Sequence, residues 1–313
     1  MKNRSNFFSG PGLIILAAFL WGLDGILRRS LYSLPPITIV FYEHLIGLLI
    51  LLPFFLRAAR GEKLTKREWG AMFLVGTLSS VLGTLWFTTA LLKTGFIAFS
   101  VVFLLQKLQP VFTVATAAIV LKEKITKDYI LWAGLAFVAA YFVTFPGGRV
   151  NLTTGRDGLI AALFAVGAAI AWGSTTAFSR YVLLKHSATY IAGLRFVIAT
   201  VFALALIPFM AGAAPTLSAI TSDQLLRLLA IALSSGMVAL WIYYRGLKQT
   251  EAKVSTILEL VFPMTAVFID IFLYHTVLHW SQYAAAVVLI YAVSRVSKLN
   301  KATLPAEEIA AAV

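Results

Sequence analysis

Charged side chains inside apolar stretches are the residues of this sequence best suited to binding chemistry. A charge within the hydrocarbon of a membrane costs about 2.5–3.5 kcal/mol, so it persists where it is paired or faces a wet cavity. Together, the permanently charged candidates would cost on the order of 15–20 kcal/mol if unpaired, more than the ~5–15 kcal/mol by which proteins are stable. We therefore expect these side chains to face inward; they are Asp24, Glu43, His44, Lys107, Arg195, Glu259 and Asp270.

Lys107 lies near the middle of its apolar stretch, directly after Gln106. We hypothesise that Lys107 pairs with Glu43, Asp24 or Glu259 in one state and yields to substrate or a proton in another. The alternative is a permanent structural ion pair. Gln106 joins Lys107 among the candidate binding or coupling residues.

Glu43 and His44 suggest proton coupling, because histidine titrates near neutral pH. Adjacent residues on a helix point about 100° apart, so we expect one of the two side chains to face a neighbouring helix instead of the cavity.

Aromatic residues form a second group of candidates. They either line a cavity, where their faces can bind organic ligands, or simply fill space. The candidates are Trp21, Trp86, Trp172, Trp241 and Tyr244. Pro110 and Pro263 each remove a backbone hydrogen bond within an apolar stretch, which predicts either a hinge or a static kink.

The elements that must position these residues occur twice. Leu78-Ser79-Ser80 recurs as Leu233-Ser234-Ser235, and Trp21-Gly22 as Trp172-Gly173. Membrane-length apolar segments span approximately 11–33, 37–57, 69–92, 95–121, 129–146, 158–184, 188–211, 223–247, 252–275 and 281–297. The sequence thus predicts an all-α membrane protein of ten transmembrane helices. Five-helix repeats at 11–146 and 158–297 must be inverted, because five is odd. A short cytoplasmic tail follows at 298–313.

Composition supports the membrane assignment. Hydrophobic residues make up 60% of the chain, charged residues 12%, and the mean hydropathy is +0.89. The net charge of +13 does not indicate nucleic-acid binding, because the basic residues are scattered among short connections. They are about three times as frequent on the side of the N-terminus, which places both termini in the cytoplasm. We expect a multi-pass protein of the inner (cell) membrane.

Several classes of chemistry are disfavoured. The chain has no cysteine, which excludes disulfides and thiolate metal sites. It carries no phosphate-binding loop, dinucleotide fingerprint, HExxH motif or GxSxG motif. We therefore predict no cofactor, no metal site and no catalytic residues. A membrane-embedded enzyme that uses Glu43, His44 or Asp24 is the alternative, and a non-transporting receptor or assembly protein is a further one.

Local motifs add up to a family resemblance. Leu20-Trp21-Gly22, Ala171-Trp172-Gly173, Gln109-Pro110-Val111-Phe112, Leu121–Thr126 and Val261–Ala266 together resemble the EamA-type branch of the drug/metabolite transporter superfamily. The resemblance covers about residues 11–297. It departs from the family pattern at Glu43, where a basic residue is common, and at Thr276, where a glutamate is common.

The resemblance implies a secondary active transporter with ten helices and a cavity between its repeats, the fifth and tenth helices being peripheral. We expect export of a small polar or amphipathic metabolite, such as an amino acid or amine, by alternating access. Protons are a candidate coupling ion, the lipid bilayer is the surrounding partner, and the oligomeric state is a monomer or homodimer.

Overall fold

The computed structural model describes residues 10–93, 98–120, 126–149, 155–210, 220–250, 255 and 258–299, and within these ranges regular structure is helical, with no strand. The first part of the chain contains α1 (Gly10–Arg29), α2 (Pro36–Ala58), α3 (Lys66–Leu74), η1 (Val75–Gly83), α4 (Thr84–Leu92), α5 (Phe99–Leu105), η2 (Gln106–Leu108), α6 (Gln109–Val120) and α7 (Lys127–Thr144). After the turn η3 (Pro146–Gly148) follow α8 (Gly155–Lys185), α9 (Ala188–Met210), α10 (Ser222–Leu233), α11 (Met237–Gln249), α13 (Val261–Phe272) and α14 (Trp280–Leu299).

Six stretches of the described chain are long and apolar enough to cross a membrane. They are Gly10–Arg29, Pro36–Ala58, Lys66–Leu92, Arg156–Lys185, Ala188–Met210 and Ser222–Gln249, and Phe99–Thr113 and Val261–Phe272 are shorter apolar helices. The all-helical membrane architecture agrees with the sequence, whereas the number of ten spans stays a prediction. The Leu121–Ile125 part of the family motif and most of the predicted tail 298–313 lie outside the described residues.

Threonines mark where several helices begin. The Thr65 hydroxyl accepts from the Glu68 amide at 3.3 Å, and the Glu68 carboxylate accepts from the Thr65 amide at 2.8 Å. Thr221 forms the same reciprocal pair with Gln224 at the start of α10. Each pair satisfies amides that have no partner within the helix, so these short sequences fix the helix ends.

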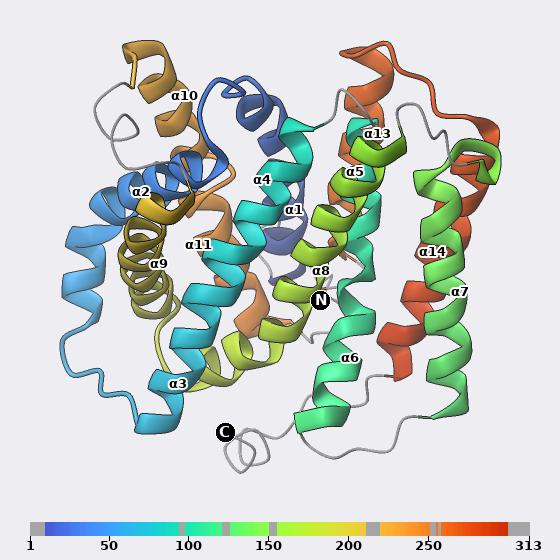
Figure 1. Ribbon diagram of the computed structural model, residues 1–313. Helices are drawn as coiled ribbons and strands as arrows, with labels where there is room; N and C mark the ends of the chain where they lie inside the picture. Colours follow the sequence, from blue (N-terminus) through green and yellow to red (C-terminus); the bar gives the residue numbers. More distant parts are fainter. Residues whose placement is uncertain are drawn as a thin grey trace, which may run out of the picture.

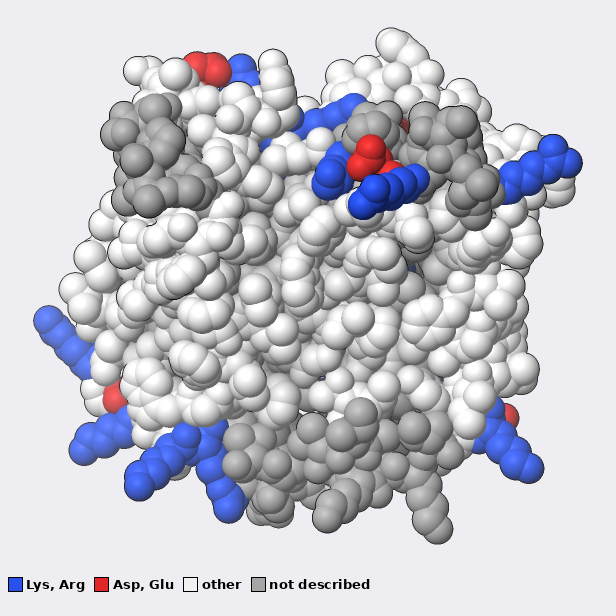
Figure 2. All heavy atoms as spheres, viewed as in Figure 1, with Lys and Arg blue, Asp and Glu red and all other residues white. Residues whose placement is uncertain are grey.

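The outer surface is apolar over the middle of the molecule. Phe209, Leu226 and Phe54 have exposed fractions of 85%, 66% and 63%. Figure 2 shows the charged side chains of one face gathered toward its upper and lower ends, with uncharged atoms between them. Such a belt suits hydrocarbon, because lipid tails do not penalise exposed apolar side chains and the helices satisfy their own backbone groups.

Helices from the two parts of the chain pack against each other around a shared centre. α2 lies against α9, α1 lies against α11 and α13, and α8 crosses η1, α4 and α6. α7 and α14 lie side by side at the right edge of Figure 1. Helices of both parts of the chain thus meet at the centre of the molecule.

Glycines permit two of these contacts at the repeated Trp-Gly pairs. A Cβ atom added to Gly22 would lie 2.5 Å from the Cβ of Thr265 on α13, and one added to Gly173 would lie 2.4 Å from the carbonyl oxygen of Gln109 on α6. Both distances are too short for an ordinary contact. Each glycine thus allows a helix of one part of the chain to approach a helix of the other part closely.

Candidate functional site

A cavity of about 170 Å³ lies between the two parts of the chain. By the measure of about 10–15 Å³ per water, it could hold on the order of a dozen water molecules. Its lining includes Trp21, Asp24, Arg28, Glu43, His44, Ser79, Thr84, Phe87, Lys107, Gln109, Trp172, Thr175, Thr176, Ser179, Arg195, Phe196, Ser235, Gly236, Leu240, Tyr243, Tyr244, Leu247, Glu259 and Phe262. Charged, aromatic and hydroxyl side chains thus meet in a space enclosed by apolar helices.

One end of the cavity is a buried ionic network built around Arg28. Its guanidinium donates to Asp24 at 2.7 Å and 3.2 Å, to Glu43 at 2.9 Å and to the Thr88 hydroxyl at 3.0 Å. The Ser235 hydroxyl donates to Asp24 at 2.5 Å. This network connects α1, α2 and α4 with the turn before α11, so it binds both parts of the chain together.

Arg28 was expected to lie in a connection between helices, like most basic residues of the chain, and the structure places it elsewhere. It is 2% exposed and points into the cavity from the last turn of α1. The signal was present, since Asp24 and Arg28 are four residues apart and so share one helix face. The neighbouring Arg29 instead lies over the ring of Tyr274, 4.5 Å from its centre.

The middle of the cavity contains a second ion pair between the two parts of the chain. The Lys107 ammonium lies 3.9 Å from the Glu259 carboxylate and 5.1 Å from the centre of the Phe262 ring. Glu259 also accepts hydrogen bonds from the hydroxyls of Tyr243 at 2.9 Å and Ser255 at 3.0 Å. Of the three partners considered for Lys107, the structure pairs it with Glu259, while Asp24 and Glu43 are held by Arg28.

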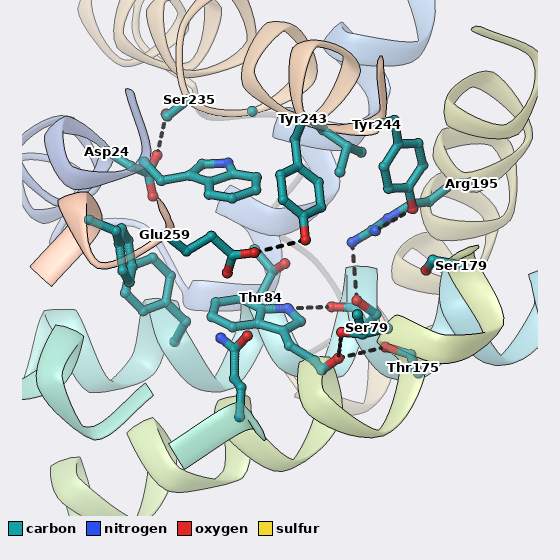
Figure 3. Close-up of a pocket in the computed structure, with 18 of the residues that line it drawn as sticks. Asp24, Ser79, Thr84, Thr175, Ser179, Arg195, Ser235, Tyr243, Tyr244 and Glu259 are labelled. Carbon is teal, nitrogen blue, oxygen red and sulfur yellow. Dashed lines mark hydrogen bonds between the residues drawn. The ribbon is translucent and has the colours of Figure 1, made fainter. Parts of the chain in front are cut away.

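The other end of the cavity is formed around Arg195 on α9. Its guanidinium donates to the hydroxyls of Ser80, of Tyr244 at 2.8 Å and of Ser79 at 3.1 Å. Figure 3 shows Arg195 and Asp24 on opposite sides of the cavity, with Glu259 and Tyr243 between them.

The repeated Leu-Ser-Ser sequence sits where regular α-helix is interrupted. The first copy lies within the π-helical segment η1, and the second lies at the turn Ser234–Gly236 between α10 and α11. Within η1 the carbonyl of Ser79 accepts from the indole nitrogen of Trp172 at 2.9 Å. Interrupted helices leave backbone and hydroxyl groups free to contact polar groups inside a membrane protein. Each copy uses this freedom to contact a charge from the other part of the chain, Arg195 or Asp24.

The formal charges that line the cavity balance. Three carboxylates (Asp24, Glu43 and Glu259) face three cations (Arg28, Lys107 and Arg195). The charges are unevenly spread, because two carboxylates share Arg28 whereas no carboxylate of the described residues lies within 4.0 Å of Arg195. The cavity is therefore neutral in sum and polarised from end to end.

A comparison with known proteins identifies the chain. The model of the EamA-like transporter family matches residues 8–145 and 159–297. This chain belongs to the EamA-like transporter family. It is 34% identical, over 94% of its length and 99% of the relative, to the riboflavin transporter ImpX of Fusobacterium nucleatum. It is 25% identical, over 82% of its length and 83% of the relative, to an uncharacterised transporter of Clostridium kluyveri.

A solved crystal structure shares the fold. It covers 93% of this chain and is itself covered over 96%, with a TM-score of 0.60 and 17% sequence identity. The resemblance inferred from the Trp-Gly and Gln-Pro motifs is thus confirmed, and the protein is a membrane transporter, not an enzyme.

The tryptophans of this EamA-family chain divide into two groups. Trp21 and Trp172 line the cavity, and the ring of Trp21 lies 4.9 Å from that of Tyr243. Trp86 does not line the cavity; its ring packs near Gly167 of α8. Trp241 also lies outside the lining, and its indole donates to the Thr189 hydroxyl at 3.0 Å. Both members of the repeated pair Trp21 and Trp172 therefore line the cavity, whereas both members of the repeated pair Leu85-Trp86 and Leu240-Trp241 place their indoles between helices.

Glu43 and His44 both reach the cavity, contrary to the expectation that one of them would turn away. The His44 Nδ1 atom donates to the Val40 carbonyl at 2.8 Å, which holds the ring against its own helix. The ring also packs against Phe196, with 5.3 Å between centres. The cavity is wide enough across α2 to include two adjacent positions.

Two polar candidates lie outside the lining. Gln106 is fully buried in η2, and its side-chain amide has no hydrogen-bond partner among the described residues. Asp270 accepts from the backbone amide of Ser100 at 2.6 Å and thereby caps α5. Asp270 thus has a structural contact that accounts for its burial.

The two prolines begin helices. Pro110 is the second residue of α6, immediately after the 3₁₀ turn η2 that carries Lys107. Pro263 is the third residue of α13, shortly after Glu259. The first amides of a helix have no partner within it, so proline costs no hydrogen bond there. Each proline therefore marks a helix interruption that presents one partner of the central ion pair.

Proposed function

We propose that this transporter is a secondary carrier whose two inverted five-helix repeats, 11–146 and 158–297, expose the central cavity to either side of the membrane in turn. Both parts of the chain line the cavity. The repeated Ser-Ser and Trp-Gly elements make corresponding contacts in both directions between them. In this proposal the protein spans the inner membrane ten times with both termini in the cytoplasm, and Pro110 and Pro263 mark the hinges.

The first candidate substrate is riboflavin, the compound named for the relative that is 34% identical over 94% of the chain. The observation that carries this assignment is the combination of a cavity of zero formal charge with aromatic side chains along it. Bringing a charged solute into such a cavity would leave an uncompensated charge, whereas a neutral aromatic solute avoids that cost. Riboflavin has a neutral tricyclic ring for Trp21, Tyr243 and Trp172, and a hydroxylated chain for the charged ends.

The second candidate is export of an amino acid or amine. It is favoured by the network in which Asp24 and Glu43 share the single guanidinium of Arg28, because excess negative charge at that end suits an ammonium group. The two candidates differ in the charge of the solute, so competition distinguishes them.

The test is counterflow of labelled riboflavin in proteoliposomes, with unlabelled riboflavin, leucine and putrescine as competitors. We expect competition by riboflavin alone. Counterflow of labelled leucine or putrescine, with none of labelled riboflavin, would establish the second candidate. Loading the vesicles at one pH and diluting them into another tests proton coupling, and Glu43 is the candidate proton site.

Trp21→Ala tests the aromatic part of the cavity. Stacking of an aromatic base on a side chain is worth about 1–3 kcal/mol, so we expect a loss of riboflavin affinity of about 5–150-fold. The matched control is Trp280→Ala on α14, where the indole is 73% exposed and outside the cavity. Equal affinities for the two variants would contradict a substrate position beside Trp21.

A further inference from the structure

The Arg195 guanidinium has more N–H groups than hydrogen-bond partners among the described residues. A guanidinium carries five N–H groups. One at Nε is donated to Ser80, one at Nη1 to Tyr244 and one at Nη2 to Ser79. One N–H remains on each Nη atom, and Arg195 lines the cavity.

Arg195 also has no ion-pair partner among the described residues. Arg28 contacts two carboxylates and Lys107 lies beside Glu259, whereas the described residues place no carboxylate within 4.0 Å of Arg195. The three hydroxyls around it are neutral and only partly replace water. A cation held in this way at membrane depth attracts an electron-rich group more strongly than the paired cations do.

The hydroxyl partners hold the guanidinium in place from two directions. Ser79 and Ser80 belong to the π-helical segment η1, and Tyr244 belongs to α11. Tyr244 is 1% exposed, so its hydroxyl has little freedom to move. Fixing Nε and one N–H of each Nη atom fixes the plane of the guanidinium, and with it the direction of the two free N–H groups.

We propose that Arg195 is the specificity-determining residue that binds a pair of adjacent hydrogen-bond acceptors on the substrate, with Ser79, Ser80 and Tyr244 as positioning residues. Carboxylates present such a pair, and so do planar heterocycles in which an unprotonated ring nitrogen lies beside a carbonyl. The inference rests on the proposed carrier function and deepens it: in riboflavin the pyrimidine edge of the ring faces Arg195, and the hydroxylated chain extends toward Asp24 and Glu43.

The experiment measures riboflavin binding by fluorescence quenching on the purified full-length protein. Arg195→Gln keeps two donors but loses the charge and the fork, and we expect an affinity about 10–100-fold weaker. Arg195→Lys keeps the charge without the fork, so it should also bind weakly. The control is Arg245→Gln on α11, whose guanidinium is exposed and lies over Trp241 outside the cavity.

Lumiflavin separates contact at the ring edge from contact at the chain, because it retains the pyrimidine edge and lacks the hydroxylated chain. Arg195→Gln should weaken lumiflavin binding by the same factor as riboflavin binding. A variant that weakens riboflavin binding but not lumiflavin binding would overturn the assignment of Arg195 to the ring edge. Ser80→Ala should lower the affinity less than Arg195→Gln does. Adding Ser80→Ala to Arg195→Lys should not restore the affinity.

Failure of the substrate and failure of the Arg195 assignment give different results. If the wild-type protein does not bind riboflavin, riboflavin is refuted as the substrate. A thermal-shift panel of carboxylates, heterocycles with a ring nitrogen beside a carbonyl, and amines then decides the role of Arg195. Stabilisation by the carboxylates or these heterocycles that is lost in Arg195→Gln supports the role. A panel that stabilises both proteins equally, or that acts only through amines, overturns it.

Discussion

Replacing Gly173 by alanine tests how closely the two parts of the transporter must approach. The added Cβ would lie 2.4 Å from the Gln109 carbonyl oxygen and 3.1 Å from the Cβ of Phe112. Carbon and oxygen normally stay about 3.3–3.6 Å apart, so α6 and α8 would have to separate by roughly 1 Å. The obstacle is backbone, which cannot rotate away. Over-packing typically costs about 1–3 kcal/mol, and alanine regains about 1 kcal/mol of helix propensity.

We therefore expect Gly173→Ala to destabilise the transporter by up to ~2 kcal/mol. The matched control is Gly134→Ala on α7, where an added Cβ meets nothing within 4 Å. That variant should be neutral or stabilised by up to ~1 kcal/mol. Denaturant unfolding in detergent, followed by tryptophan fluorescence, measures both. If both variants shift the midpoint equally, close approach at Gly173 is not required and the packing argument is wrong.

Two further predictions concern charges that connect the parts of the chain. Partial burial acts to raise the pKa of Glu62, but hydrogen bonds from the His186 ring and the Ser187 amide lower that pKa overall. A carboxyl whose pKa is lowered by folding stabilises the protein fully at pH values above its usual pKa, and this contribution is lost as the pH falls. The wild-type protein should therefore lose stability on acidification below about pH 4.5 more steeply than Glu62→Gln. Parallel curves of stability against pH for the two proteins would contradict this. Lys107→Met alone leaves Glu259 buried without its cation and should cost about 3–5 kcal/mol, whereas adding Glu259→Gln should restore part of it. Unfolding free energies of the single and double variants measure this coupling, and additive losses would show that the pair does not interact.

The sequence predicted the inward charges well, because the cost of a charge in hydrocarbon does not depend on the details of a fold. Asp24, Glu43, Lys107, Arg195 and Glu259 all line one cavity. Their pairing was less predictable. Three acids were possible partners of Lys107, and the choice depends on how helices distant in the sequence cross.

Arg28 was missed because two adjacent arginines at a helix end resemble the basic residues of a connection. Only the first points inward, and residue type alone does not distinguish it from Arg29. Trp86 and Trp241 show the converse. They repeat as faithfully as Trp21 and Trp172, yet they pack between helices outside the cavity. Repetition identifies positions that correspond in the two parts of the chain. The rotation of each helix about its axis then determines where the side chain at such a position points.

The interruptions of the helices were the least predictable feature. The Ser-Ser repeat was evident in the sequence, but a reading with 3.6 residues per turn gives no sign of the π-helical segment at Val75–Gly83. That segment determines which way Ser79 and Ser80 point, and so brings them to Arg195.

The same three residues adopt two shapes in one molecule: Leu78-Ser79-Ser80 stays wound, while Leu233-Ser234-Ser235 runs into an open turn. If the halves are equivalent by descent, either sequence can take either shape, and the molecule holds one of each at a time. Winding the second while opening the first would produce a second conformation, in which the two sequences exchange their shapes. Both conformations would then use local backbone shapes that one molecule already contains.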